Sequence, residues 1–190
     1  MYTRDPAFWR AGAIASTLFM SAVLVILTIN SLNAITPGGS HVPRYDVINH
    51  HITYEDDSAR GEFVPKIGGE ELLFNQKYDE SEATALIGKG KMVIQSRACM
   101  DCHTFFGNGA YYAPDLTRAW LDPIWQESAG TKRGEVMAAF LMKPFRLGLH
   151  EMPNLHLSRD EARSVVAYLK WMSAVDTNGF PSWSGVAQRK

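Results

Sequence analysis

The feature that most limits what this chain can fold into is a long stretch without charge. No Asp, Glu, Lys or Arg occurs from Ala11 to Pro43, and residues 11–29, AGAIASTLFMSAVLVILTI, are apolar or small throughout. A helix of about 20 such residues can cross a membrane. A buried core helix and a cleaved signal peptide are the alternatives, but the apolar core of a signal peptide has only about 7 to 15 residues. The sequence therefore predicts an uncleaved membrane anchor over residues 11–35.

The residues before the anchor predict its orientation. Arg4 and Arg10 precede the apolar run, and Trp9 is placed to mark the membrane interface. Because positively charged residues favour the cytoplasmic side, we expect residues 1–10 in the cytoplasm and everything after Ile35 outside it.

Residues 36–80 are expected to form a loop-rich connector outside the cytoplasm. They open with TPGGS and contain further Gly and Pro residues, which favour turns. Two segments, ITYE and GEFVPKI, are candidates for short strands. The net charge of −1, without a basic cluster, argues against nucleic-acid binding by this or any other part of the chain.

Beyond residue 78 the apolar residues recur with the period of a helix. Asp79 and Glu82 form a predicted capping box ahead of a first helix, and Ser158 with Glu161 forms another ahead of a last one. A further helix is predicted between them, over about residues 133–142. No run of alternating strands follows residue 80, so we expect residues 81–190 to form one mainly α domain.

The motif CMDCH, residues 99–103, contains the only two cysteines of the chain, Cys99 and Cys102. A disulfide across so short a loop would contribute little, because loop-closure stabilisation grows with loop length. A zinc site needs four ligands, and no second pair of Cys or His residues is suitably spaced. A thioredoxin-like motif would need a βαβ context, which this region lacks. The spacing C-x-x-C-H instead predicts covalent attachment of a c-type haem.

The chemistry of haem attachment explains the spacing of the motif. Two thiols one helical turn apart can add to the two vinyl groups at one porphyrin edge, so Cys99 and Cys102 are the predicted thioether positions. His103, the next residue, is then the predicted proximal ligand of the iron. Attachment of haem c takes place outside the cytoplasm, which agrees with the orientation predicted for the anchor.

The chain resembles the class I cytochrome c family over about residues 81–175. GKMVIQSRACMDCH is similar to the first helix of that family running into the haem motif, and AYLKWM is similar to its last helix. The resemblance implies close packing of Gly90 against Tyr168, which would justify a glycine that otherwise costs a helix about 1 kcal/mol. It also implies that the carbonyl of Pro114, in PDL, accepts a hydrogen bond from His103.

The family usually supplies the sixth ligand of the iron as a methionine from a loop before the last helix. Met152, in LHEMPNLHLS, is the predicted ligand, because no helical period covers it. His150 and His156 flank it and are the alternative, which would lower the potential. The methionines of the predicted helices are expected to fill the core instead. These are Met92, Met137, Met142 and Met172.

An iron with both axial positions filled has no site for a substrate, so the domain is expected to transfer electrons without catalysing a reaction itself. A haem-based gas sensor is an alternative that would require Met152 to leave the iron. Aromatic side chains near the motif are available to wall the pocket. They are Phe105, Phe106, Tyr111, Tyr112, Trp120 and Trp125.

A narrower resemblance is carried by CMDCHTFFGNGAYYAPDLTRAW, MPNLHLS and YLKWMSAVDTNGFP. With the single N-terminal anchor, these stretches are similar to the cytochrome c subunit of bacterial cytochrome-c-dependent nitric oxide reductase. The resemblance implies a single-pass subunit of the bacterial inner membrane with a periplasmic haem domain. It would accept electrons from a soluble cytochrome c or a cupredoxin and pass them to haem b of a large polytopic subunit. There haem b3 and a non-haem iron would reduce two NO to N2O and water.

The same resemblance implies a calcium ion where the two subunits meet. The carbonyl of Gly109 and Tyr111 would be the ligands from this chain, whereas the alternative is a tight turn at GNG and packing of Tyr111 at the haem. Two other functions stay open for a membrane-anchored cytochrome c with one haem: the equivalent subunit of a cbb3-type oxidase, and a free-standing carrier.

Overall fold

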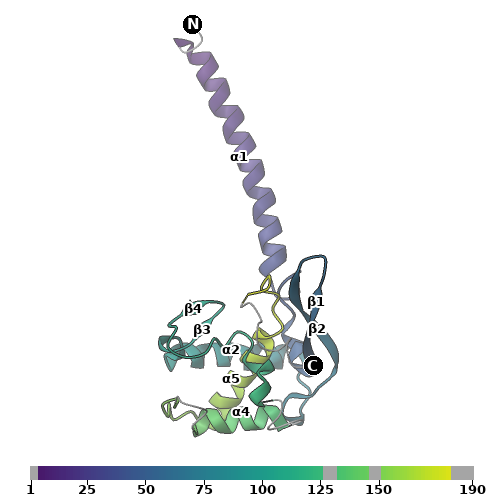
Figure 1. The fold of residues 1–190 in the computed structure, drawn as a ribbon. Helices are drawn as coiled ribbons and strands as arrows, with labels where there is room; N and C mark the ends of the chain where they lie inside the picture. Colours follow the sequence, from purple (N-terminus) through teal and green to yellow (C-terminus); the bar gives the residue numbers. More distant parts are fainter. Residues whose placement is uncertain (1–3, 126–131, 146–150, 181–190) are drawn as a thin grey trace. The chain divides into compact units, whose positions relative to one another are not determined.

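The computed structural model of the chain describes residues 4–125, 132–145 and 151–180. The chain divides into two compact units, Met1–Val42 and Pro43–Lys190. Helix α1, Pro6–Ile35, dominates the first unit, and the other described helices and strands belong to the second (Figure 1).

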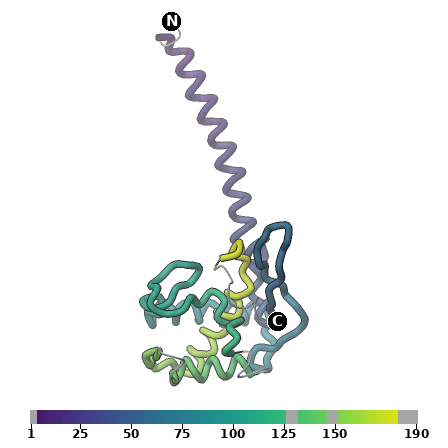
Figure 2. The backbone as a smooth tube through the Cα atoms, in the orientation of Figure 1, coloured from purple at the N-terminus to yellow at the C-terminus, as the bar shows by residue number. Residues whose placement is uncertain are grey.

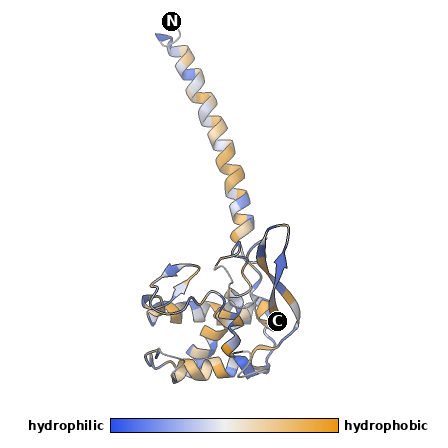
Figure 3. Cartoon of the chain, viewed as in Figure 1, coloured by the Kyte–Doolittle hydropathy of each residue, from blue (hydrophilic) through white to orange (hydrophobic). Residues whose placement is uncertain are grey.

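Helix α1 begins at a side-chain cap and is apolar along most of its length (Figure 3). The Asp5 carboxylate accepts a hydrogen bond from the backbone N–H of Ala7 at 2.9 Å, and Pro6 occupies the first turn, where its missing N–H costs nothing. No residue of α1 is buried within the chain. Among the described residues, α1 is the one helix long and apolar enough to cross a membrane.

The second unit begins with a short 3-10 helix and a β-hairpin. The helix η2, Tyr45–Asn49, leads into β1, His50–Asp57, which pairs antiparallel with β2, Glu62–Glu70 (Figure 2). The strands predicted in ITYE and GEFVPKI are thus confirmed. The segment is less loop-rich than expected, and it contributes Val47, Ile48 and Ile52 to the buried core of this unit.

Three helices make up most of the rest of the second unit. They are α2, Glu80–Ser96, α4, Arg133–Met142, and α5, Arg159–Met172, and α5 packs against both of the others (Figure 1). Both predicted capping boxes are confirmed, with Asp79 and Ser158 as the N-caps. The short elements are η3 (Leu73–Asn75), η4 (Cys99–Asp101), β3 (Thr104–Phe105), β4 (Asn108–Gly109) and η5 (Ala119–Leu121). The domain is mainly helical, as predicted.

Helices α2 and α5 cross in close contact at Gly90. A Cβ atom at this position would overlap the carbonyl oxygen of Ser164 and would lie 3.0 Å from the Cβ of Tyr168. The predicted contact of Gly90 with Tyr168 is therefore confirmed, and the glycine is explained by the closeness of the two backbones.

The hairpin is fastened to the segment that follows α5. The Tyr54 hydroxyl, from β1, donates to the carbonyl oxygen of Ser173 at 3.1 Å. The Arg60 guanidinium, at the hairpin turn, lies 2.8 Å from the Asp176 carboxylate. Arg118 stacks on the Tyr54 ring with its guanidinium carbon 4.1 Å from the ring centre. These contacts hold residues 173–180 in place beside the hairpin.

Replacement of Gly90 by Ala should destabilise the second unit by about 2 kcal/mol or more, because the added methyl group forces α2 away from the α5 backbone. Chemical denaturation of the haem-loaded protein, followed by circular dichroism, measures the loss. Gly88→Ala is the matched control, since a Cβ at Gly88 meets nothing within 4 Å. It should raise stability by up to about 1 kcal/mol. Equal effects of the two substitutions would contradict the role assigned to the crossing.

Candidate haem-binding site

The CMDCH motif lies on a separate turn after helix α2. Arg97 caps the helix, and Ala98 takes the left-handed conformation with φ of 53°. In the following η4 turn, the backbone N–H groups of Cys102 and His103 donate to the carbonyl oxygen of Cys99 at 3.3 and 2.9 Å. The resemblance implied a helix running straight into the motif, which is wrong because the left-handed residue breaks it. The turn gathers the three predicted haem-binding side chains at one place.

Both cysteines of the motif are partly buried. Burial raises the pKa of the Cys99 thiol, and the neighbouring Cys102 raises it further. Neither thiol is used in a disulfide, so both are available for addition to an unsaturated group.

The imidazole of His103 is held by the loop that follows the motif. Its Nδ1 lies 2.7 Å from the carbonyl oxygen of Pro114. Since a carbonyl oxygen only accepts hydrogen bonds, Nδ1 must carry the proton, which leaves the lone pair on Nε2. That tautomer is the one a metal-binding histidine needs when its second nitrogen is anchored to the protein.

Asp115 fixes the loop that carries the Pro114 carbonyl. Its Oδ2 accepts a hydrogen bond from the Thr104 hydroxyl at 2.6 Å, and its Oδ1 accepts one from the backbone N–H of Thr117 at 2.8 Å. The Thr104 carbonyl in turn accepts from the N–H of Leu116 at 2.8 Å. These hydrogen bonds connect Thr104, which follows His103, to the residues that follow Pro114. They therefore hold His103 and Pro114 at a fixed distance from each other.

A mostly apolar cavity opens beside the motif turn. Its wall includes Cys99 and His103 from the motif and Met152 from the segment before α5. Helices α2, α4 and α5 and the loop after the motif supply the rest of the lining, which is Ile94, Phe105, Leu116, Ala119, Trp125, Met137, Phe140, Leu141, Val165 and Leu169. A thiol, an imidazole and a thioether on an otherwise apolar wall form a donor set that fits a haem. Cys102 belongs to the same turn.

The structure separates the candidate sixth ligands. Met152 reaches the cavity, whereas His156, with φ of 52°, is exposed and does not line it. His150 lies outside the described residues. Met137, assigned to the core by the sequence, also lines the cavity and is 3% exposed, so a second thioether is present there. Met92 is 63% exposed and does not fill the core as expected.

The predicted aromatic wall is only partly correct. Phe105 and Trp125 line the cavity, and Trp120 is buried, but Phe106, Tyr111 and Tyr112 are exposed. Phe106 lies in the tight turn between β3 and β4, and Tyr111 and Tyr112 follow β4. The sequence missed Phe140 and Leu141, whose helical pattern indicates a buried face without indicating what that face lines.

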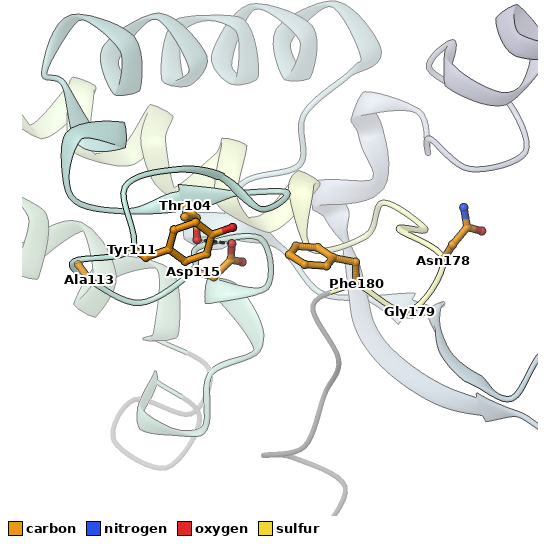
Figure 4. A pocket seen from close by; sticks show the side chains of 7 residues that line it. All are labelled: Thr104, Tyr111, Ala113, Asp115, Asn178, Gly179 and Phe180. Atoms are coloured by element: carbon orange, nitrogen blue, oxygen red, sulfur yellow. Dashed lines mark hydrogen bonds between the residues drawn. The ribbon is translucent and has the colours of Figure 1, made fainter.

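A second hollow lies beside the loop that follows the CMDCH motif. It is bordered by Tyr111, the Thr104–Asp115 hydrogen bond and the C-terminal segment up to Phe180 (Figure 4). The Tyr111 hydroxyl donates to the carbonyl oxygen of Gly107 at 2.9 Å. Gly109 has φ of 129°, and a Cβ there would overlap the His103 carbonyl. Among the described residues, no group of three or more His, Cys, Asp or Glu side chains forms a metal site.

Comparison with known proteins gives consistent matches. The cytochrome c family model matches residues 87–173. The chain is 34% identical over 119 residues to the nitric oxide reductase C subunit of Stutzerimonas stutzeri, covering 58% of this chain and 75% of that protein. It is 30% identical over 104 residues to the corresponding protein of Paracoccus denitrificans, covering 54% and 69%. The corresponding protein of Halomonas halodenitrificans is 26% identical over 110 residues, covering 57% and 73%.

Replacement of Asp115 by Ala should destabilise the haem-loaded protein by about 2 kcal/mol, because two hydrogen bonds are lost at about 1 kcal/mol each. Urea denaturation followed by absorbance in the visible range measures the change. Asp115→Asn keeps the size of the side chain and one carbonyl acceptor, so its loss should be smaller. If Asp115→Ala is as stable as the original chain, the network does not hold the loop.

Proposed function

Because the chain belongs to the family of nitric oxide reductase C subunits, we propose that it is the electron-transfer subunit of a bacterial nitric oxide reductase. The family and the apolar helix α1 identify a cytochrome c subunit with a membrane helix. The observation that carries the proposal is the cavity that brings Cys99, His103 and Met152 together on an apolar wall.

The proposal assigns roles to three residues of the motif and to two outside it, Met152 and Pro114. Cys99 and Cys102 would hold the haem through thioether bonds, and His103 Nε2 and Met152 Sδ would bind its iron. The Pro114 carbonyl keeps the His103 ring in the orientation that ligation needs. The bound haem c supplies one-electron chemistry at its iron. With His103 and Met152 both bound to the iron, no substrate would reach it, so the chain would move electrons and the reaction would take place in a partner.

The proposed route runs from a soluble cytochrome c or a cupredoxin to this chain, and from it to haem b of a large polytopic subunit. That subunit, with haem b3 and a non-haem iron, combines two NO, two electrons and two protons to give N2O and water. The names of the relatives support such a partner, since each is the C subunit of a nitric oxide reductase.

We propose that α1 anchors the chain in the bacterial inner membrane with residues 1–10 in the cytoplasm. Residues 36–80 and the haem domain of residues 81–190 then lie in the periplasm. Arg4, just before α1, and Arg10, in its first turns, support this orientation, since positive residues favour the cytoplasmic side. The C-x-x-C-H motif supports it independently, because haem c is attached outside the cytoplasm.

The calcium ion at the subunit interface stays a prediction for the Gly109 carbonyl and Tyr111. Exposure of Tyr111, at 82%, leaves it open to a partner protein. The hydroxyl of Tyr111 already donates to Gly107, and its oxygen still has lone pairs with which to bind a cation.

Purification of the complex through this chain tests the proposal. Membranes are solubilised in detergent, the chain is isolated by a tag, and the proteins that accompany it are identified. We expect a large membrane subunit with haem b, non-haem iron and NO-consuming activity. A copper-containing partner would identify an oxidase subunit instead, and a lone cytochrome of 21.2 kDa would identify a free-standing carrier.

Replacement of Met152 by Ala should open the sixth position and let CO bind to the reduced haem, while covalent attachment stays intact. Absorption spectra with and without CO measure this. Met92→Ala, on the exposed face of α2, is the control and should leave the spectrum unchanged. If Met152→Ala does not change the spectrum and Met137→Leu does, Met137 is the ligand and the assignment is wrong. An unaltered chain whose spectrum responds to CO or NO would support a gas sensor.

A further inference from the structure

Lys170 is buried although its side chain is charged. It lies on α5 with an exposed fraction of 0%. Its Nζ donates to the carbonyl oxygen of Glu71 at 3.0 Å and lies 3.8 Å from Oε2 of the same residue. Lysine is almost never fully buried unless it is paired, so its position in the core calls for a physical reason.

A second buried cation lies against the same aromatic ring. The guanidinium carbon of Arg133 is 4.7 Å from the centre of the Trp120 ring, and Lys170 Nζ is 4.8 Å from it. Arg133 and Trp120 are 8% and 2% exposed, so these contacts are shielded from water. Arg133 Nη1 also donates to the Trp120 carbonyl at 3.2 Å. Lys170, Arg133 and Trp120 are called the cationic cluster below.

The cationic cluster has more positive than negative charge. Within the part of the chain that the structure describes, Glu71 is the one carboxylate in an ion pair with it. That carboxylate is shared, because Glu71 Oε2 also lies 2.9 Å from Nδ1 of His51. Two buried atoms of the cluster, Trp120 Nε1 and Arg133 Nε, have no hydrogen-bond partner among the described residues. The cluster therefore holds positive charge that Glu71 does not fully compensate.

The three residues of the cluster are close neighbours, along the chain or on one helix face, of residues that line the haem cavity. The residue before Trp120 and the residue before Lys170 both line that cavity. Arg133 lies four residues before Met137, another lining residue, and therefore on the same face of α4. A charge in this position acts through protein and not through bulk water, so its field at the cavity is weakly screened.

We infer that Lys170 and Arg133 raise the reduction potential of the haem c in this cavity. The inference rests on the electron-transfer function proposed above. Reduction adds one electron and lowers the positive charge of the iron centre. A neighbouring buried cation therefore repels the oxidised centre more than the reduced one and favours the reduced state. The cluster thus sets how readily the chain accepts an electron from its donor protein.

Lys170 also makes this effect depend on pH. The pKa of Lys170 is lowered to about 8; burial is the main cause, Glu71 opposes the shift, and Arg133 contributes to it. Below that pH the lysine is charged and the reduced haem is favoured; as the pH rises through it, the proton leaves and the potential falls. By linkage, an electron arriving from the donor protein favours uptake of a proton from water by Lys170. The charged or titratable groups facing it are Glu71, Arg133 and, through Glu71, His51.

Redox titration of the full-length, haem-loaded protein tests the inference. The midpoint potential is followed by visible absorbance from about pH 6 to about pH 10, a range that brackets the titration of the lysine. Lys170→Met should lower the potential at neutral pH and abolish its fall above about pH 8. Methionine fills the space without charge, and apolar replacement of a buried charge is commonly tolerated.

Three further variants separate charge from structure. Lys170→Arg keeps a permanent charge, so the potential should stay high and no longer fall above about pH 8. Lys89→Met, at an exposed position of α2, is the matched control and should change neither quantity. His51→Gln should leave the fall above about pH 8 in place.

The outcomes distinguish this inference from the proposed function. If Lys170→Met binds haem and shows the potential and pH profile of the original chain, the inference is overturned while the haem site stands. If the original chain itself binds no haem covalently, the proposed function is overturned first. If Lys170→Met does not fold, the absence of a pH-dependent fall in Lys170→Arg supports the inference, and its persistence overturns it.

Discussion

The close crossing of α2 and α5 at Gly90 is the contact on which the rest of the second unit depends. From this point α2 runs on to the CMDCH turn, and α5 starts just after the segment that carries Met152. Ile94 and Leu169, on either side of the crossing, both line the cavity. A wider crossing would move the two walls apart, and with them the CMDCH turn and Met152, which the fold brings to one cavity from separate parts of the sequence.

The sequence predicted best what depends on local spacing. Side chains three or four residues apart predict the capping boxes at Asp79 and Ser158 and the bounds of α4. The structure confirms these predictions. It predicted less well what depends on backbone turns. A left-handed Ala98 has no signal, because alanine favours helix. Tyr111 and Tyr112 are exposed and follow the pairing of β3 with β4, which two residues in each strand do not encode.

The buried cations show a different limit of sequence reasoning. The spacing of apolar residues in α5 predicts the helix, but it does not explain why a charged residue lies among them. Lys170 lies four residues after Val166, so the pattern itself places it on a buried face. Its partner Glu71 lies 99 positions away along the chain. A lysine inside a helical apolar stripe is thus a detectable sign of a buried charge, but the residue that accepts its hydrogen bond is known only from the fold.

The loop after the haem motif has one side that contacts His103 and another that is exposed to solvent. Its hydrogen bonds explain how both sides are held in place. Its inner side holds the His103 ring through the Pro114 carbonyl, while Tyr111 and Tyr112 on its outer side are more than 80% exposed. Backbone bonds from Ala113 to Cys102 and from Leu116 to Thr104, both 2.8 Å, tie the loop to the motif. A partner protein that contacts the two tyrosines therefore meets a loop that is already ordered. Docking then costs little conformational entropy and need not disturb the His103 ring.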